Sequence, residues 1–335
     1  MGKTTVLGMM FLAAAMAACT GNATKGSAEA DSDAVAAMTD SVPENFEFEA
    51  IERMAGLPTS VPPVPLYVRT SPEEGQVVEV VYWTPLNKPA ADSDPEYLAS
   101  WQIQDRMRQQ KNQYTKVMGE DGLLLDVTFV EDVTSEDADN AMLRSPQNPM
   151  QGLKFKFNNP KDLKKLQGDG YCYKLLWLLA DEYLNPRTRL TVKTVSESQH
   201  KPLPTDVVKA METKYGMKAD RSALTATIGN DYKTGFIQFK PKGKQCLAVE
   251  LLMCGEDIWS YSDEAQYFEG EGFTWHVDDD GEYYPNIYDA AFIGSDGIEL
   301  LFMHLSAEST NFGWMTIKGD KLVQHEVGGY YNYPE

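Results

Sequence analysis

The second half of the chain alternates apolar and polar residues in short runs that predict β-strands. These runs cover residues 223–228, 236–240, 246–253, 273–277, 287–293, 298–305, 312–318 and 321–327. Turn signals such as Lys242-Gly243 and Gly319-Asp320 separate them, and no helical spacing intervenes. Consecutive strands joined by short turns predict an antiparallel β meander, sandwich or half-barrel over residues 217–335.

The preceding part of the chain mixes strand and helix patterns. Strands are predicted at residues 77–83, 123–130, 153–157 and 188–195. Ser93 and Glu96 fit a capping box, and apolar residues at helical spacing extend a helix from there to Gly119. Three further helices, the second apolar on nearly every side and therefore buried, are predicted at residues 159–168, 171–184 and 205–216. Residues 61–216 should thus form a mixed α/β portion, and the whole chain an α+β fold.

Residues 19–60 have no pattern that would form a core. Between residues 20 and 50, seven acidic residues and one base stand among Ala, Ser and Thr. Such a segment cannot bury enough apolar surface to offset the entropy of ordering it. We expect a disordered acidic tether. The run Val61–Pro65 then gives a stiff, polyproline-like entry into the folded region.

The first eighteen residues have the pattern of a signal peptide. Lys3 precedes an apolar stretch from Val6 to Ala18, and small residues stand directly before Cys19. That stretch is too short to span a bilayer, which needs about 20 residues. Small residues followed by a cysteine resemble the lipobox of bacterial lipoproteins. The resemblance implies cleavage before Cys19, lipidation of that cysteine (a palmitate-type modification), and a mature protein anchored in the cell envelope, at the outer membrane.

The net charge of the chain limits the classes of molecule that such a protein can bind. The formal net charge is −20, which opposes binding to phosphate backbones and to anionic lipid headgroups. A nucleic-acid partner is therefore excluded, and the acyl chains should be the sole membrane contact. Surface lipoproteins of the Bacteroides type often carry acids directly after the lipidated cysteine. The segment Thr20–Ala28 has none, so the periplasmic face and the cell surface both stay open.

An acidic loop before the strand at 287–293 presents oxygen atoms at alternating positions. Calcium prefers six to eight oxygen ligands on a flexible loop, and Gly281 allows the positive φ that folds a chain around an ion. The loop resembles the calcium loop of FG-GAP repeats. That resemblance implies a calcium ion held by Asp278, Asp280, Glu282, the carbonyl of Tyr284, and Asn286.

The acidic loop also departs from the FG-GAP pattern. Glu282 stands in place of an Asp, Tyr283 in place of the second Gly, and Asn286 in place of the last Asp. A plain solvated hairpin tip is the alternative, because Asp and Gly also gather in turns.

Aromatic residues are concentrated in the same part of the chain. Trp259, Tyr261, Trp275 and Tyr283 could form an exposed aromatic surface that binds a glycan, a peptide or a protein. The alternative is that they are core residues or cross-strand pairs, which sheets favour.

Catalytic patterns are weak. No His-x-x-x-His pair and no Gly-x-Ser-x-Gly elbow occurs. Glu250, Glu299 and Asp289 could pair as in glycosidases, and His304 or His276 could act with an acid. We therefore expect a lipid-anchored envelope protein with a binding or structural role, calcium-stabilised if the acidic loop holds an ion. The alternative is an extracytoplasmic hydrolase using carboxylates or a His–acid pair.

Overall fold

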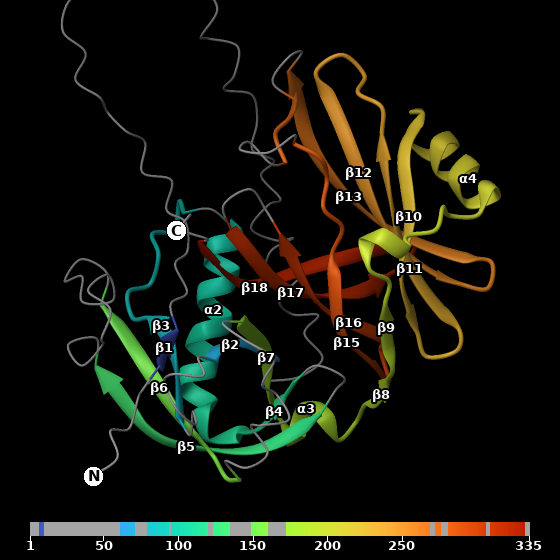
Figure 1. Cartoon of the computed structure of the whole chain (residues 1–335). Coiled ribbons are helices and arrows are strands. Elements are labelled where there is room, and N and C mark those ends of the chain that lie inside the picture. The colour runs from blue at the N-terminus through green and yellow to red at the C-terminus, as the bar shows by residue number, and fades with distance from the viewer. Residues whose placement is uncertain are drawn as a thin grey trace, which may run out of the picture.

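The computed structural model describes residues 7–9, 61–70, 79–93, 95–119, 123–134, 149–159, 172–268, 272–275, 281–305 and 309–331. Within these ranges the protein is mostly β, with the strands arranged in two sheets (Figure 1). The helices there are α2 (Pro95–Gln110), α3 (Asp181–Leu184) and α4 (Thr205–Tyr215), with short 3-10 turns at η1 (Lys111–Gln113) and η6 (Glu197–Gln199). The predicted α+β class is therefore only partly correct, because the N-terminal portion is also built mainly of strands.

The N-terminal sheet has the strand order β1-β3-β6-β5-β4-β7-β2 in the described residues. It curls around α2 as a half-barrel (Figure 1). Its strand β1, within the predicted signal peptide, pairs in parallel with β3. The bounds are β1 (Leu7–Met9), β2 (Val64–Thr70), β3 (Glu79–Pro85), β4 (Tyr114–Met118), β5 (Leu124–Thr134), β6 (Met150–Phe157) and β7 (Cys172–Ala180).

Two predictions for this portion were wrong, and a third holds at most for residues 61–63. The apolar run at 171–184 forms strand β7, followed only by the short helix α3. Consecutive residues of β7 are buried (Trp177, Leu178, Leu179 and Ala180), so both faces of the strand are covered and no alternation marks it as a strand. The helix expected to reach Gly119 ends at Gln110, and β4 follows. The expected polyproline entry passes into strand β2 at Val64. The helix predicted at 159–168 lies outside the described residues, apart from Asn159.

The C-terminal sheet closes into a near-barrel. Its order is β8-β15-β16-β17-β18-β13-β12-β11-β10-β9, with β14 paired to β13. β8 and β9 are consecutive in the chain yet lie at opposite ends of this order, so the sheet returns to its start. The bounds are β8 (Thr188–Leu190), β9 (Val192–Thr194), β10 (Ala219–Ile228), β11 (Tyr232–Phe239), β12 (Gln245–Cys254), β13 (Asp257–Phe268), β14 (Gly272–Phe273), β15 (Ile287–Gly294), β16 (Gly297–Leu305), β17 (Ser309–Lys318) and β18 (Lys321–Tyr331).

Most strands of this sheet follow the predicted runs, as does α4, which ends at Gly216 with a φ of 64°. The strand β13 was not predicted. Polar residues in the strand (Asp263, Glu264 and Gln266) interrupt its alternation of apolar and polar residues. Trp259 and Tyr261 alternate along it and pack against the apolar cluster inside the near-barrel. Two of the four aromatic residues proposed as an exposed surface, Trp259 and Tyr261, thus lie on this strand and are half-buried.

The two sheets share one hydrophobic core. Ile103 and Met107 of α2 pack with Trp177 of β7 and with Leu301 and Trp314 of the C-terminal sheet. On the other side of the C-terminal sheet, α4 packs against β11 and β12. No helix within the described ranges has both the length and the apolarity needed to cross a membrane.

Candidate functional site

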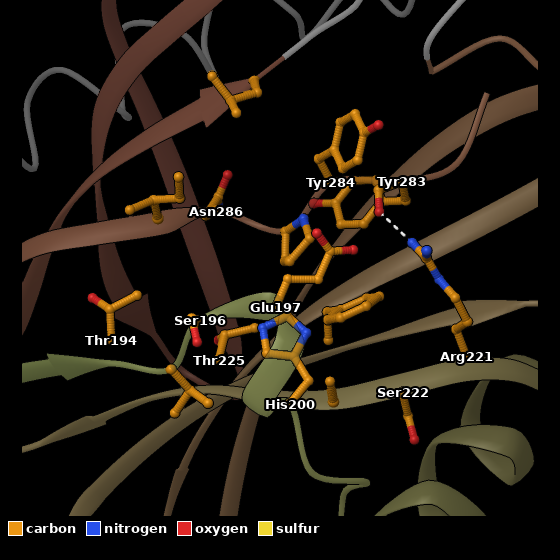
Figure 2. Close-up of a pocket in the computed structure, with 16 residues that line it drawn as sticks. Thr194, Ser196, Glu197, His200, Arg221, Ser222, Thr225, Tyr283, Tyr284 and Asn286 are labelled. Carbon is orange, nitrogen blue, oxygen red and sulfur yellow. Dashed lines mark hydrogen bonds between the residues drawn. The ribbon is translucent and has the colours of Figure 1, made fainter. Parts of the chain in front are cut away.

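A cavity of about 410 Å³ lies at one end of the near-barrel. It opens where the chain leaves β9 and departs from its neighbour β10. Three groups of residues line it: the segment after β9, the inner side of β10 and β11, and the segment that leads into β15 (Figure 2). These groups come from parts of the chain up to 93 residues apart (Thr194 to Ile287), and the near-barrel brings them together.

The first side of the cavity is a pinched loop, residues 195–201, here called the η6 loop. Its ends are hydrogen-bonded to adjacent residues of β10: the Val195 N–H donates to the Thr225 carbonyl, and the Leu224 N–H donates to the Lys201 carbonyl, each at 2.8 Å. Between these ends the chain stands away from β10. Glu197 reaches from this loop toward the opposite side of the cavity, while His200 packs beside Phe236 with ring centroids 6.3 Å apart (Figure 2).

The opposite side is the wall segment, residues 283–287. Its first residue, Tyr283, is buried and donates its backbone N–H to the Gln238 side-chain oxygen at 3.1 Å. The guanidinium of Arg221 donates to the Tyr283 carbonyl at 2.6 Å and forms an ion pair with Glu282. The cavity wall is thus fixed to both β10 and β11.

Gly281 sets the entry to the wall segment. Its φ is 72°, and a Cβ atom at this position would collide with the backbone of Phe273. The positive φ predicted for this glycine is confirmed. The close approach of the Phe273 backbone is a second reason for glycine here, because it leaves no room for a Cβ atom.

A buried carboxylate lies behind the wall segment. Glu250 of β12 has no exposed surface. Its Oε1 accepts from the Asn286 N–H at 2.8 Å and from the Tyr283 hydroxyl at 3.0 Å, while its Oε2 accepts from the Tyr288 hydroxyl at 3.2 Å. Burial raises the pKa of Glu250 to about 7, and these three hydrogen bonds only partly oppose the rise.

The two tyrosine hydroxyls that donate to this carboxylate stay protonated. Burial raises the pKa of Tyr283 and of Tyr288 well above the usual value, so both phenols keep their protons. The Asn286 side chain turns to His304 instead, with Asn286 Oδ1 and His304 Nδ1 at 2.9 Å. The His304 ring in turn lies 5.7 Å from the Tyr283 ring, between centroids. The wall segment is therefore the outer layer of a polar network inside the near-barrel.

In the described part of the predicted calcium loop, the side chains of Glu282 and Asn286 already have partners within the protein. Glu282 pairs with Arg221, and the buried Asn286 meets His304, so these two side chains have different partners. Tyr284 lines the cavity. Asp278 and Asp280 lie outside the described residues, as do His276 and Cys19. Within the described ranges, no three His, Cys, Asp or Glu residues gather closely enough to hold a metal ion. The calcium site stays a prediction.

Of the four predicted aromatic binding residues, only Tyr283 lines the cavity. Trp275 packs edge-on against Tyr283, with ring centroids 5.4 Å apart, and donates to Asp263 at 3.2 Å. Trp259 and Tyr261 pack against the apolar cluster inside the near-barrel. Trp275 therefore contacts the cavity lining through Tyr283, whereas Trp259 and Tyr261 are half-buried against that cluster.

Sequence reasoning missed the residues that shape the cavity. Arg221, Phe236 and His200 carry no local motif. The sequence offers Glu250 only as one of three scattered carboxylates. The other two have partners elsewhere: Glu299 pairs with Arg187, and the Asp289 carboxylate accepts a hydrogen bond from the Trp177 indole. One signal did exist, since Glu250 is the single polar residue in the apolar run from Cys246 to Cys254.

No protein-family profile, curated protein or solved structure matches the chain.

Proposed function

We propose that the chain is a lipid-anchored cell-envelope protein that binds a compact, uncharged glycan in the cavity between the η6 loop and the wall segment. The observation that carries the proposal is the composition of that cavity. Its volume of about 410 Å³ lies in the range of small-molecule sites. Its lining combines aromatic rings with several hydroxyl groups.

The lining suits the two kinds of surface that a sugar presents. Phe236 and Tyr283 contribute apolar ring atoms to the lining, although both side chains are almost fully buried. Residues with hydroxyl groups that can both donate and accept also line the cavity: Thr194, Ser196, Tyr284, and Thr225, whose hydroxyl is hydrogen-bonded to that of Thr234 at 2.9 Å. A sugar hydroxyl also donates and accepts, so such partners can satisfy it in either role.

Charge favours an uncharged ligand over an anion. The one arginine in the lining, Arg221, already pairs with Glu282. Glu197 brings a carboxylate into the same cavity, and the chain as a whole carries a formal charge of −20. An anionic ligand would meet this repulsion with no uncompensated arginine to offset it.

The same geometry disfavours a hydrolase that uses Glu250. The pKa of Glu250, about 7, suits a general acid or base. However, its oxygens accept from three internal donors, and the carboxylate has no exposed surface. Tyr283 and Asn286 line the cavity, whereas Glu250 does not. A substrate would have to displace the wall segment to reach it.

Calorimetric titration of the full-length, detergent-solubilised protein tests the proposal. The panel is glucose, galactose, N-acetylglucosamine, maltose and cellobiose. Phe236→Leu removes an aromatic ring from the lining, so this variant should bind the sugar about tenfold more weakly. The matched control is Phe239→Leu, the same change on the same strand, because Phe239 packs on the outer side against α4 and should not affect binding. Failure of every sugar to bind, or equal affinity for Phe236→Leu and wild type, would show the proposal to be wrong.

A further inference from the structure

We infer that Glu197 determines which sugars the cavity accepts, because its carboxylate binds two adjacent, unsubstituted hydroxyl groups of the ligand. The inference deepens the proposed function and rests on it, since it names the class of glycan that the cavity selects. That class is a neutral sugar with a free pair of neighbouring hydroxyls. Sugars in which one hydroxyl of the pair is absent or substituted are bound more weakly.

The Glu197 carboxylate has no partner within the described part of the chain. No lysine or arginine there forms an ion pair with it, and no hydrogen bond to its side chain occurs. Its backbone is engaged instead, since the His200 N–H donates to the Glu197 carbonyl at 3.1 Å. The side chain is exposed, lines the cavity and reaches toward the wall segment (Figure 2). Both carboxylate oxygens are therefore open to a ligand.

The backbone that carries Glu197 is fixed at its ends and between them. Val195 and Lys201 hold the ends of the η6 loop to β10 through backbone hydrogen bonds of 2.8 Å. Within the loop, the Gln199 N–H donates to the Ser196 carbonyl at 2.8 Å and forms part of the 3-10 turn η6. A ligand that binds the carboxylate therefore has little of the loop to order, which keeps the entropic cost of binding low.

Glu197 is the single carboxylate among the described residues that line the cavity. Hydrolysis of a glycosidic bond generally uses two carboxylates, about 5 to 9.5 Å apart. The lining supplies one, and the arginine there, Arg221, is paired with Glu282 outside it. The carboxylate of Glu197 is therefore suited to holding a sugar and not to cleaving one.

The chemistry of a carboxylate decides what it selects. An ionised carboxylate only accepts hydrogen bonds, and its two oxygens can accept from two donors at once. Hydroxyls on neighbouring ring carbons of a sugar lie close together, so each can donate to one oxygen. Hydrogen bonds to an ionised acceptor are about twice as strong as those between neutral groups. Loss of either hydroxyl removes one such bond, and this loss is the basis of the selection.

Calorimetric titration of the full-length, detergent-solubilised protein with deoxy sugars tests the inference. The probes are glucose, galactose and the singly deoxygenated analogues of each. In the wild type, two analogues that lack neighbouring hydroxyls should bind about tenfold more weakly than the parent sugar. In Glu197→Gln the parent sugar should bind about tenfold more weakly, and its advantage over those two analogues should largely disappear. The matched control is Glu264→Gln, which changes an exposed glutamate of β13 outside the cavity lining and should bind like the wild type.

The outcomes separate this inference from the proposed function. Equal affinity of Glu197→Gln and the wild type for the parent sugar would overturn the inference and leave the glycan proposal intact. Tighter binding of glucosamine than of glucose, with the preference lost in Glu197→Gln, would also overturn it, because the carboxylate would then recognise a cation. Failure of both glucose and galactose to bind would overturn it too, while the other sugars of the panel would still decide the glycan proposal.

Discussion

Glu250 and Glu299 are two buried glutamates of the C-terminal sheet, and they differ in what balances their charge. Arg187 pairs with Glu299 at 2.9 Å, and the Tyr183 hydroxyl donates to it at 2.7 Å. Glu250 has three neutral donors, and no ion pair with it occurs among the described residues. One carboxylate is compensated by a permanent cation, while the other depends on hydrogen bonds alone.

The positions of the two residues explain the difference. Arg187 and Tyr183 belong to the connection between the last strand of the N-terminal sheet and β8, so the Glu299 pair fastens the two sheets together. Glu250 lies behind a cavity and holds its wall. Arg187 keeps its charge, so the ion pair that joins the two sheets is permanent. Glu250 has only neutral donors, so its carboxylate can lose its charge by binding a proton.

Removing the cation from the joint should have the largest effect. Arg187→Ala leaves Glu299 buried without compensation, which typically costs 3–5 kcal/mol. Urea unfolding should show this loss as a lower midpoint. Lys193→Ala removes an exposed cation nearby and should change the free energy of unfolding by less than about 0.5 kcal/mol. Similar values for the two variants would mean that the joint does not depend on the ion pair.

Replacing the uncompensated carboxylate should alter the pH dependence of stability. The folded pKa of Glu250 is about 7, above its ordinary value of 4.5, so its contribution is fully present below pH 4.5 and is lost as the pH rises to 7. The wild type should therefore lose about 3 kcal/mol more than Glu250→Gln across this window. Thermal or urea unfolding at pH 4.5 and pH 8 measures the difference. Parallel profiles for the two proteins would place the pKa of Glu250 in its ordinary range.

The smallest effect should come from removing one donor at each glutamate. Tyr288→Phe and Tyr183→Phe each delete one hydroxyl and should each lower the free energy of unfolding by about 1 kcal/mol. Only Tyr288→Phe should raise the pKa of Glu250, because that hydroxyl stabilises its ionised form. Unfolding profiles against pH would show the titration shifted upward. A shift in Tyr183→Phe instead would mean that the two networks are coupled.

Local patterns predicted much of the fold and little of the site. Strands such as β16 and β17, and the stop of α4 at Gly216, follow from alternation and turn chemistry. β7 was missed because a strand covered on both faces has no alternation. β13 was missed because polar residues interrupt its pattern.

The site could not be predicted because its residues meet only through the closure of the sheet. His200, Phe236 and Tyr283 are each unremarkable in their own stretch of sequence, and no periodicity connects them. The charge within the apolar run around Glu250 was the one usable sign. It indicated a buried, hydrogen-bonded acid but not which residues would surround it.

The seam between β8 and β9 has a consequence for how the protein is made. These two strands leave the ribosome before β10, and β15 follows about 95 residues after β8. Until then β8 has no partner in the C-terminal sheet, and its unpaired edge is open to pairing with other chains. Long-range pairing of this kind is slow and exposes the growing chain to aggregation. β15 therefore pairs with a strand that was synthesised long before it, and a truncated chain that ends before β15 would keep that edge open.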